Sequence, residues 1–182
     1  MHDKLPCFFS FIKTHDENHI RKLDKKIAII FRDYETRYTE NLIINIKKTC
    51  KKSGRKFFLA NNLKLAIKLD LDGVYLPAFN QRNIYSKNNY KKKFTIIGSA
   101  HSIKEIKIKE QQGVKLIFLS PLFKVDKSKK FLDPIKFNFL ASHTKIRVIA
   151  LGGINRSNIK KLKLLKSYGF AAISYFKNHD KV

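Results

Sequence analysis

The sequence is poor in the features that mark secreted and membrane proteins. It has only two cysteines, Cys7 and Cys50, whose separation matches no metal-binding or redox motif, and we expect both to be reduced. No apolar run approaches the roughly 20 residues that a membrane span needs. The first residues lack the charged start and long apolar centre of a signal peptide. Together these absences predict a cytoplasmic protein.

Acidic residues are also scarce, with 14 Asp and Glu against 39 Lys and Arg, a net charge of +25. Such a charge is compatible with nucleic-acid binding. However, the lysines are spread along the whole chain, and they accompany many Ile, Asn and Phe residues, a bias that AT-rich codons produce. We therefore do not expect a nucleic acid as the main partner, although the positive field would attract small anionic substrates.

Short apolar runs alternate with lysine-rich segments along the 182 residues, a length that suffices for one domain with a substantial core. Several runs are continuous, as expected of strands buried on both faces. Helical spacing places Ile103, Ile106 and Lys107 on one face of a predicted helix. The predicted strands are residues 6–12, 27–31, 56–60, 73–76, 94–98, 116–119, 147–151 and 170–174, and the predicted helices are residues 35–52, 63–69, 102–112 and 155–168.

Eight strands separated by helices predict a closed (β/α)₈ barrel formed by one domain, residues 1–182. The usual minimum for that fold is about 200 residues, so we expect shortened helices. The connections 13–26 and 80–93 look eroded, and only residues 175–182 remain for the last helix, which should be truncated. The alternative is an open doubly wound sheet.

A glycine pair, Gly152-Gly153, ends the seventh predicted strand. In such barrels the active site lies at the carboxyl ends of the strands, and the loops after strands seven and eight often bind phosphate. Glycine lets backbone N–H groups approach a ligand, and a following helix start favours an anion. We expect the second half of this phosphate site around Ser174. The alternative is a tight turn without a ligand.

Two other strand ends carry residues suited to chemistry. Arg32 follows the second strand and could bind phosphate or carboxylate in a bidentate manner; a salt bridge is the alternative. His101 follows the fifth strand and could transfer a proton near neutral pH; a merely hydrogen-bonded histidine is the alternative. Behind it, Ser102 and Glu105 predict a capping box.

Seven short motifs at the strand ends follow one another with the spacing of a barrel. They are Phe31-Arg32-Asp33, Ala60-Asn61-Asn62, Leu71-Asp72-Gly73-Val74-Tyr75-Leu76, Ile97-Gly98-Ser99-Ala100-His101-Ser102, Ser120-Pro121-Leu122-Phe123, Ile149-Ala150-Leu151-Gly152-Gly153-Ile154 and Ala171-Ala172-Ile173-Ser174.

With these motifs, residues 27–176 resemble the thiamine phosphate synthase and TenI family of (β/α)₈ barrels. The resemblance implies an enzyme of thiamine biosynthesis that holds a thiazole phosphate on Gly152, Gly153 and Ser174. Synthases of the family join hydroxymethylpyrimidine diphosphate to the thiazole phosphate and release pyrophosphate, with Mg²⁺. TenI-type tautomerases move a proton on a thiazole carboxylate phosphate without a metal.

The chain departs from the synthase pattern at charged positions. Two acidic positions of that pattern are Asn62 and Asn80 here, and its lysine after Arg32 is Tyr34. Because Mg²⁺ usually binds one or two carboxylates, these changes favour the tautomerase, with no metal. The resemblance then gives His101 the proton transfer and Arg32 the substrate carboxylate.

The synthase remains the alternative and would need Mg²⁺. For it, the resemblance makes Ser99 an active-site serine, places Asn61 and Asn62 against the substrate, and places Lys129 near pyrophosphate. A non-catalytic thiazole-phosphate binder and a nucleic-acid-binding protein are further alternatives. The short last helix also leaves a homo-oligomer open.

Overall fold

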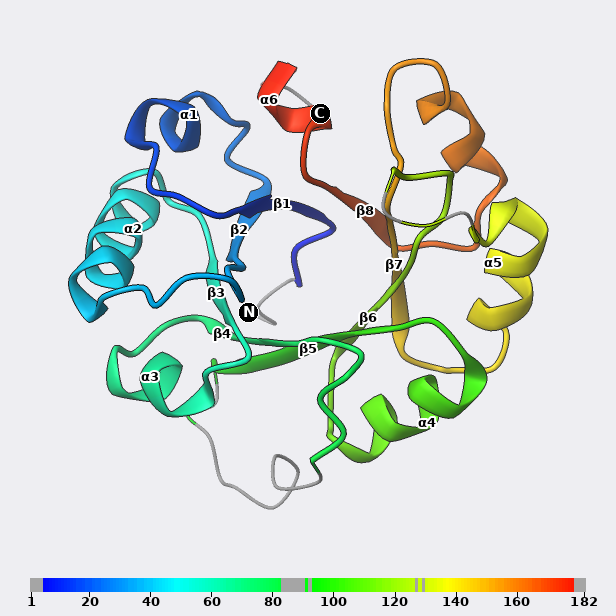
Figure 1. The fold of residues 1–182 in the computed structure, drawn as a ribbon, viewed down its shortest axis with the longest axis horizontal. Helices are drawn as coiled ribbons and strands as arrows, with labels where there is room; N and C mark the ends of the chain where they lie inside the picture. The colour runs from blue at the N-terminus through cyan, green and yellow to red at the C-terminus, as the bar shows by residue number, and fades with distance from the viewer. Residues whose placement is uncertain (1–4, 83–90, 92, 127, 129, 179–182) are drawn as a thin grey trace.

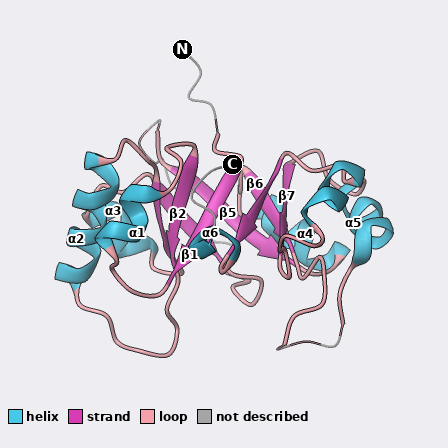
Figure 2. Cartoon of the chain, turned by 90° about the horizontal axis from the view of Figure 1, so that it is seen from above, coloured by secondary structure: helices cyan, strands magenta, loops and turns pink. Residues whose placement is uncertain are grey.

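The computed structural model describes residues 5–82, 91, 93–126, 128 and 130–178. Eight parallel strands form a closed barrel in chain order, since β1 pairs with β8 as well as with β2. Figure 1 looks into this ring of strands, with the helices outside it. The view from above in Figure 2 shows the strands side by side, flanked by helices. The closure confirms the predicted (β/α)₈ barrel and excludes the open sheet.

Every predicted run corresponds to a strand, with boundaries that agree within two residues. The agreement reflects the continuous apolar runs, because most strand residues are buried on whichever side of the sheet they face. The strands are β1 (Phe8–Ile12), β2 (Ile27–Phe31), β3 (Phe57–Ala60), β4 (Gly73–Leu76), β5 (Thr95–Ala100), β6 (Leu116–Leu119), β7 (Arg147–Leu151) and β8 (Gly169–Ala172).

Aromatic rings fill the interior of the barrel. The Phe9 and Phe118 ring centroids lie 4.9 Å apart, and the Tyr75 centroid lies 5.5 Å from that of Phe118, both in edge-to-face geometry. Each such pair contributes roughly 0.5–1.5 kcal/mol beyond burial. A second, larger apolar layer joins the outer side of the strands to the helices. The interior is therefore a packed core, and chemistry is confined to the barrel's ends.

The helices are short, as predicted, and the last has only four residues. Thr39 caps α2, so this helix begins later than predicted. The Ser102 half of the predicted capping box of α4 is confirmed, because the Ser102 hydroxyl accepts a hydrogen bond from Glu105 N at 3.3 Å. The Glu105 carboxylate instead accepts a bond from His101 N at 2.6 Å. We did not predict α1, which lies in the connection expected to be eroded, or α5. The helices are α1 (Glu17–Lys22), α2 (Glu40–Lys52), α3 (Leu63–Lys68), α4 (Ile103–Gln111), α5 (Asp133–Ala141) and α6 (Tyr175–Asn178).

The predicted α-helix over residues 155–168 is wrong. Only the 3₁₀ helix η1 (Ile159–Leu164) forms there. The Asn155 side-chain oxygen accepts hydrogen bonds from the backbone N–H groups of Ser157 at 3.0 Å and Asn158 at 3.2 Å. Side-chain bonds of this kind compete with helical ones. As a result, no α-helix start lies directly after the glycine pair.

The structure can be compared with two expectations from the sequence, that both cysteines are reduced and that no segment spans a membrane. Cys7 and Cys50 are both free, and burial raises the pKa of the Cys50 thiol to about 12, which keeps it protonated at neutral pH. Within the described residues, no helix combines the length and the apolar character needed to cross a membrane. The connection 80–93 is described only in part, because residues 83–90 and 92 lie outside the described chain.

Candidate active site at the mouth of the barrel

The carboxyl ends of the parallel strands meet at one end of the barrel, which we call the mouth. Because all eight strands run in the same direction, the residues that end them lie around one opening. The structure therefore brings most of the predicted site residues to the same end of the fold. They are Arg32 after β2, Asn61 and Asn62 after β3, Ser99 in β5, His101 after β5, Gly152 and Gly153 after β7, and Ser174 after β8.

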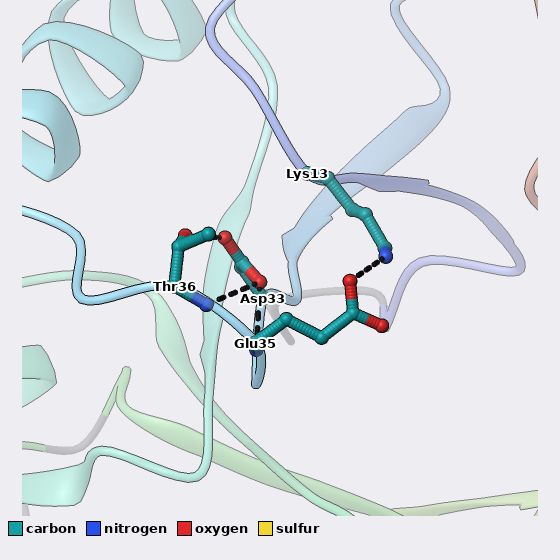
Figure 3. A network of polar contacts seen from close by, with 4 residues as sticks. All are labelled: Lys13, Asp33, Glu35 and Thr36. Carbon is teal, nitrogen blue, oxygen red and sulfur yellow. Dashed lines mark hydrogen bonds and ion pairs between the residues drawn. The ribbon is translucent and has the colours of Figure 1, made fainter.

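Arg32 makes no salt bridge with a described carboxylate. Its guanidinium carbon instead lies 4.6 Å from the centroid of the Phe11 ring, a cation–π contact. An ion pair joins Lys13, which follows β1, to Glu35 in the loop after β2, with Nζ and Oε2 3.0 Å apart (Figure 3). The salt-bridge alternative for Arg32 is therefore not found among the described contacts.

Asp33, the acid after Arg32, is engaged in a turn. Its carboxylate accepts hydrogen bonds from Glu35 N at 3.0 Å and Thr36 N at 3.3 Å, and also from the Thr36 hydroxyl (Figure 3). The hydroxyl bond is the largest of the effects that hold the pKa of Asp33 below its usual value. This carboxylate thus shapes the loop that follows β2.

Tyr75 is a site residue that we did not predict from the sequence. Its phenol is buried at the floor of the mouth, and burial raises its pKa, while the neighbouring Ser99 hydroxyl and Arg32 guanidinium act in the opposite direction. Ser99 is itself only 4% exposed. The one sequence signal was a hydroxyl group within an apolar, buried strand. Tyr75 thus lies beside the two predicted residues Arg32 and Ser99.

Asn61 and Asn80 form a pair of amides across the mouth. The Asn80 Nδ2 group donates a hydrogen bond to Asn61 Oδ1 at 2.7 Å. Asn61 adopts a left-handed conformation, with φ of +57°, and its N–H donates to the Tyr75 carbonyl at 2.8 Å. Asn62 instead caps α3, accepting a bond from Leu65 N at 3.1 Å. Its predicted contact with substrate stays a prediction.

The described residues do not fit a resident Mg²⁺ ion. Mg²⁺ prefers anionic oxygen ligands, whereas Asn61, Asn62 and Asn80 are neutral. The side-chain oxygens of Asn61 and Asn62 already accept hydrogen bonds. Among the described side chains, no cluster of three or more His, Cys, Asp or Glu residues could hold a metal. The amide positions therefore offer no anionic ligand.

His101 is oriented by the loop after β6. Its Nδ1 lies 2.5 Å from the Ser120 carbonyl oxygen. A carbonyl only accepts hydrogen bonds, so Nδ1 carries the hydrogen, and Nε2 is the basic nitrogen of the neutral ring. The residue is exposed, and its backbone N–H donates to Glu105 Oε2 at 2.6 Å. The geometry suits a proton acceptor at the mouth and is equally that of a hydrogen-bonded histidine.

The glycine pair packs tightly against the loop after β6. Gly152 and Gly153 have φ of +99° and +69°, which only glycine adopts easily. A Cβ on Gly152 would lie 2.9 Å from Pro121 Cα, and one on Gly153 would lie 2.6 Å from the Lys124 carbonyl oxygen. Close packing alone thus requires glycine at both positions.

The same loop presents backbone donors. Among the described residues, none accepts a hydrogen bond from the N–H of Gly152 or Gly153. Beside the loop opens a groove of about 610 Å³ lined by residues that include Lys124 and Ser128. Ser174 is exposed at the end of β8. Lys129, predicted near pyrophosphate, lies outside the described residues.

Comparison with known proteins places the chain in one family. The family model described as "Thiamine monophosphate synthase" matches residues 19–176. The chain is 29% identical to "Putative thiamine-phosphate synthase 2" of Aquifex aeolicus (strain VF5), over 90% of this chain and 92% of that protein. It is 30% identical to "Thiamine-phosphate synthase" of Pelagibacter ubique (strain HTCC1062), over 93% of this chain and 84% of that protein.

A solved structure agrees in fold. Thiamine phosphate pyrophosphorylase from Pyrococcus furiosus superposes with a TM-score of 0.75 and 19% identity, covering 95% of this chain and 88% of that one. At this identity the likeness shows the fold alone. The family match covers most of the chain, including the carboxyl ends of β2 to β8. This chain is therefore a member of the thiamine monophosphate synthase family of enzymes.

Proposed function

We propose that the protein joins hydroxymethylpyrimidine diphosphate to a thiazole phosphate and releases pyrophosphate. The observation that carries this proposal is the group of Arg32, Tyr75 and Ser99 at the floor of the mouth, where one cation lies beside two hydroxyl groups. The names of the two relatives that match nearly the whole chain support this transfer over the tautomerase reaction, which the residue pattern favoured.

The thiazole phosphate would bind at the glycine loop. The N–H groups of Gly152 and Gly153 donate to no described acceptor and could bond phosphate oxygens. The Ser174 hydroxyl would contribute from the end of β8. The backbone carbonyl of Lys124 lies next to Gly153, and the side chain of this residue could add a positive charge beside the loop. The overall charge of +25 would raise the local concentration of both anionic substrates.

The coupling step needs charge stabilisation rather than a base. The bond between the methylene carbon of the pyrimidine and the diphosphate oxygen breaks, and its electron pair leaves with pyrophosphate. The lone pair of the thiazole nitrogen forms the new C–N bond. Arg32 could bind the departing diphosphate through its N–H groups. The Tyr75 and Ser99 hydroxyls could orient the pyrimidine by hydrogen bonds. Since the described residues do not fit a resident metal ion, no step is assigned to one.

The tautomerase is the second candidate, and His101 is the observation that favours it. With Nδ1 bonded to the Ser120 carbonyl, Nε2 is the nitrogen that could take a proton from the substrate and return it at another position. The neutral amides Asn62 and Asn80 also suit a reaction that needs no metal.

A paired turnover assay on one purified sample separates the candidates. One half receives the pyrimidine diphosphate, the thiazole phosphate and Mg²⁺; the other receives the thiazole carboxylate phosphate and a metal chelator. We expect thiamine phosphate and pyrophosphate in the first half. Isomerisation in the second half alone would replace the proposal with the tautomerase. Tight binding of thiazole phosphate without turnover in either half would make the protein a non-catalytic binder.

A further inference from the structure

A lysine is completely buried behind the mouth. Lys109 of α4 has 0% of its surface exposed, although lysine is almost never fully buried without a partner. Its stem passes close to Gly98 of β5, where an added Cβ would come within 3.0 Å of Lys109 Cδ. The glycine thus gives the lysine room to pass along the outside of the barrel.

The ammonium group of Lys109 donates three hydrogen bonds to neutral oxygens. Its Nζ lies 2.9 Å from the Pro77 carbonyl, 2.7 Å from the Asn80 carbonyl and 2.9 Å from Gln112 Oε1. An ammonium group has three protons, so all of its donors are used. None of the described ion pairs includes this lysine.

Gln112, also 0% exposed, extends the same contact. Its Nε2 group donates to the Asn80 carbonyl at 3.0 Å and to the Arg82 carbonyl at 2.9 Å. Two adjacent side chains at the end of α4 therefore bind three backbone carbonyls of the turn formed by residues 77–82, which follows β4.

Keeping a charge in this place has a cost. Burial lowers the pKa of Lys109 to about 8, and the Glu105 carboxylate acts in the opposite direction. A buried charge is tolerated where it is fully hydrogen-bonded. The carbonyls of the turn supply that bonding, so the turn has to stay in one position for the lysine to remain satisfied.

The turn carries two side chains of the mouth. Asn80 donates to Asn61 at 2.7 Å. The Phe79 ring, 64% exposed, meets the Tyr34 ring edge to face, with their centroids 5.4 Å apart. An exposed aromatic pair beside two amides is suited to a planar heteroaromatic ring, which can stack on one and hydrogen-bond to the other.

We propose that Lys109 and Gln112 are positioning residues, which hold the 77–82 turn so that Asn80 and Phe79 face the heteroaromatic ring of a substrate. The ring rests on the proposed function, whereas the positioning of the turn does not. Because neither side chain reaches the mouth itself, their loss should weaken binding of the ring more than the chemical step.

The test replaces each residue by an apolar one of similar length, Lys109→Met and Gln112→Met, with Lys104→Met on the exposed side of α4 as the control. The first readout is hydrogen exchange of the Asn80 and Arg82 amides, which are bonded inside the turn. We expect roughly 10-fold faster exchange in both variants, unchanged exchange in β7, and no effect in the control.

The second readout is steady-state kinetics. We expect KM for the ring substrates to rise roughly 10-fold, with kcat changed less than about 3-fold. Unchanged exchange of the turn, or equal acceleration in β7, would overturn the positioning role. If Lys109→Met does not fold, hydrogen exchange and KM of Gln112→Met alone test the positioning role. Absence of wild-type turnover would refute the proposed function, while the exchange result would still decide the positioning of the turn.

Discussion

Asn80 and Asn61, from the loops after β4 and β3, are joined by a side-chain hydrogen bond of 2.7 Å. Asn80 is only 9% exposed, and its Oδ1 also accepts a bond from Arg82 N at 3.2 Å. Each amide of this pair thus has a defined orientation. By the resemblance, Asn80 stands at a position where the synthase pattern has an acid, whereas Asn61 matches that pattern.

Asn80→Asp tests how a carboxylate in place of this amide changes the Mg²⁺ dependence of the reaction. The substitution would add a carboxylate but remove the donor to Asn61, so we expect a loss of about 1–2 kcal/mol in the free energy of unfolding. We also expect the coupling rate to reach half-maximum at roughly 10-fold lower Mg²⁺ concentration, because a carboxylate binds Mg²⁺ better than an amide. Asn41→Asp, on exposed α2 surface, is the control. An unchanged Mg²⁺ dependence would contradict the expectation.

Gly153→Ala should be more destabilising than Gly54→Ala. Both glycines have similar positive φ, +69° and +65°. A Cβ on Gly153 would lie 2.6 Å from the Lys124 carbonyl, whereas one on Gly54 would meet nothing within 4 Å. We expect Gly54→Ala to lose about 1 kcal/mol and Gly153→Ala at least about 2 kcal/mol more, measured by urea unfolding. Affinity for thiazole phosphate should fall only in Gly153→Ala. Equal losses would show that the contact with the β6 loop can relax.

Tyr75→Phe should reduce activity with little effect on the fold. The ring would still fill the barrel, but Arg32 and Ser99 would lose the neighbouring hydroxyl group. We expect kcat/KM for coupling to fall roughly 10-fold. Tyr168→Phe removes the hydroxyl that donates to the Leu5 carbonyl at 2.9 Å and serves as the control. Full activity in Tyr75→Phe would remove this phenol from the site.

His101→Asn separates the two candidate reactions. Asparagine can still donate to the Ser120 carbonyl but cannot accept a proton from a substrate. If coupling is the main activity, its rate should change less than about 3-fold, while any tautomerase turnover should fall by a factor of about 100 or more. A comparable loss of coupling would mean that His101 takes part in the transfer.

The pKa of Lys109 predicts a dependence of stability on pH. Its value in the folded protein, about 8, is below the ordinary 10.5, so the unfolded chain binds more protons between these values. The free energy of unfolding therefore rises with pH between about 8 and 10.5, and this contribution is lost as the pH falls from 10.5 through 8. Between pH 7 and pH 9.5, the free energy of unfolding of the wild type should rise by about 2 kcal/mol more than that of Lys109→Met. Parallel stability curves for the two proteins would contradict the assignment.

The barrel was predictable because most of its strands are continuous apolar runs. The helices were less so. Ile103, Ile106 and Lys107 were assigned to one face of α4, but the structure exposes Lys107 and buries Lys109 instead. A lysine buried by backbone carbonyls from another loop has no signature in its own helix. Its partners at Pro77 and Asn80 are about 30 positions away along the chain.

Site residues at the strand ends were predictable for a related reason, since a parallel barrel brings all strand ends together. The contacts between them were not. Asn61 and Asn62 are adjacent amides with similar chemistry, yet one faces Asn80 and the other caps α3. The segment after Gly153 looked helical, but side-chain bonds from Asn155 and Asn158 fold it into a turn. Such choices depend on geometry that periodicity does not contain.

The aromatic side chains inside the barrel limit the routes by which reactants and products could enter and leave the site. Since the rings of Phe9, Phe118 and Tyr75 occupy the interior, the described part of the chain leaves no passage through the barrel. In the proposed coupling reaction, two reactants and two products would all pass through the mouth, so the order of binding and release would be determined there. Changing the lengths of the surrounding loops would alter that order, and with it the choice of reactants, while leaving the barrel's own packing untouched.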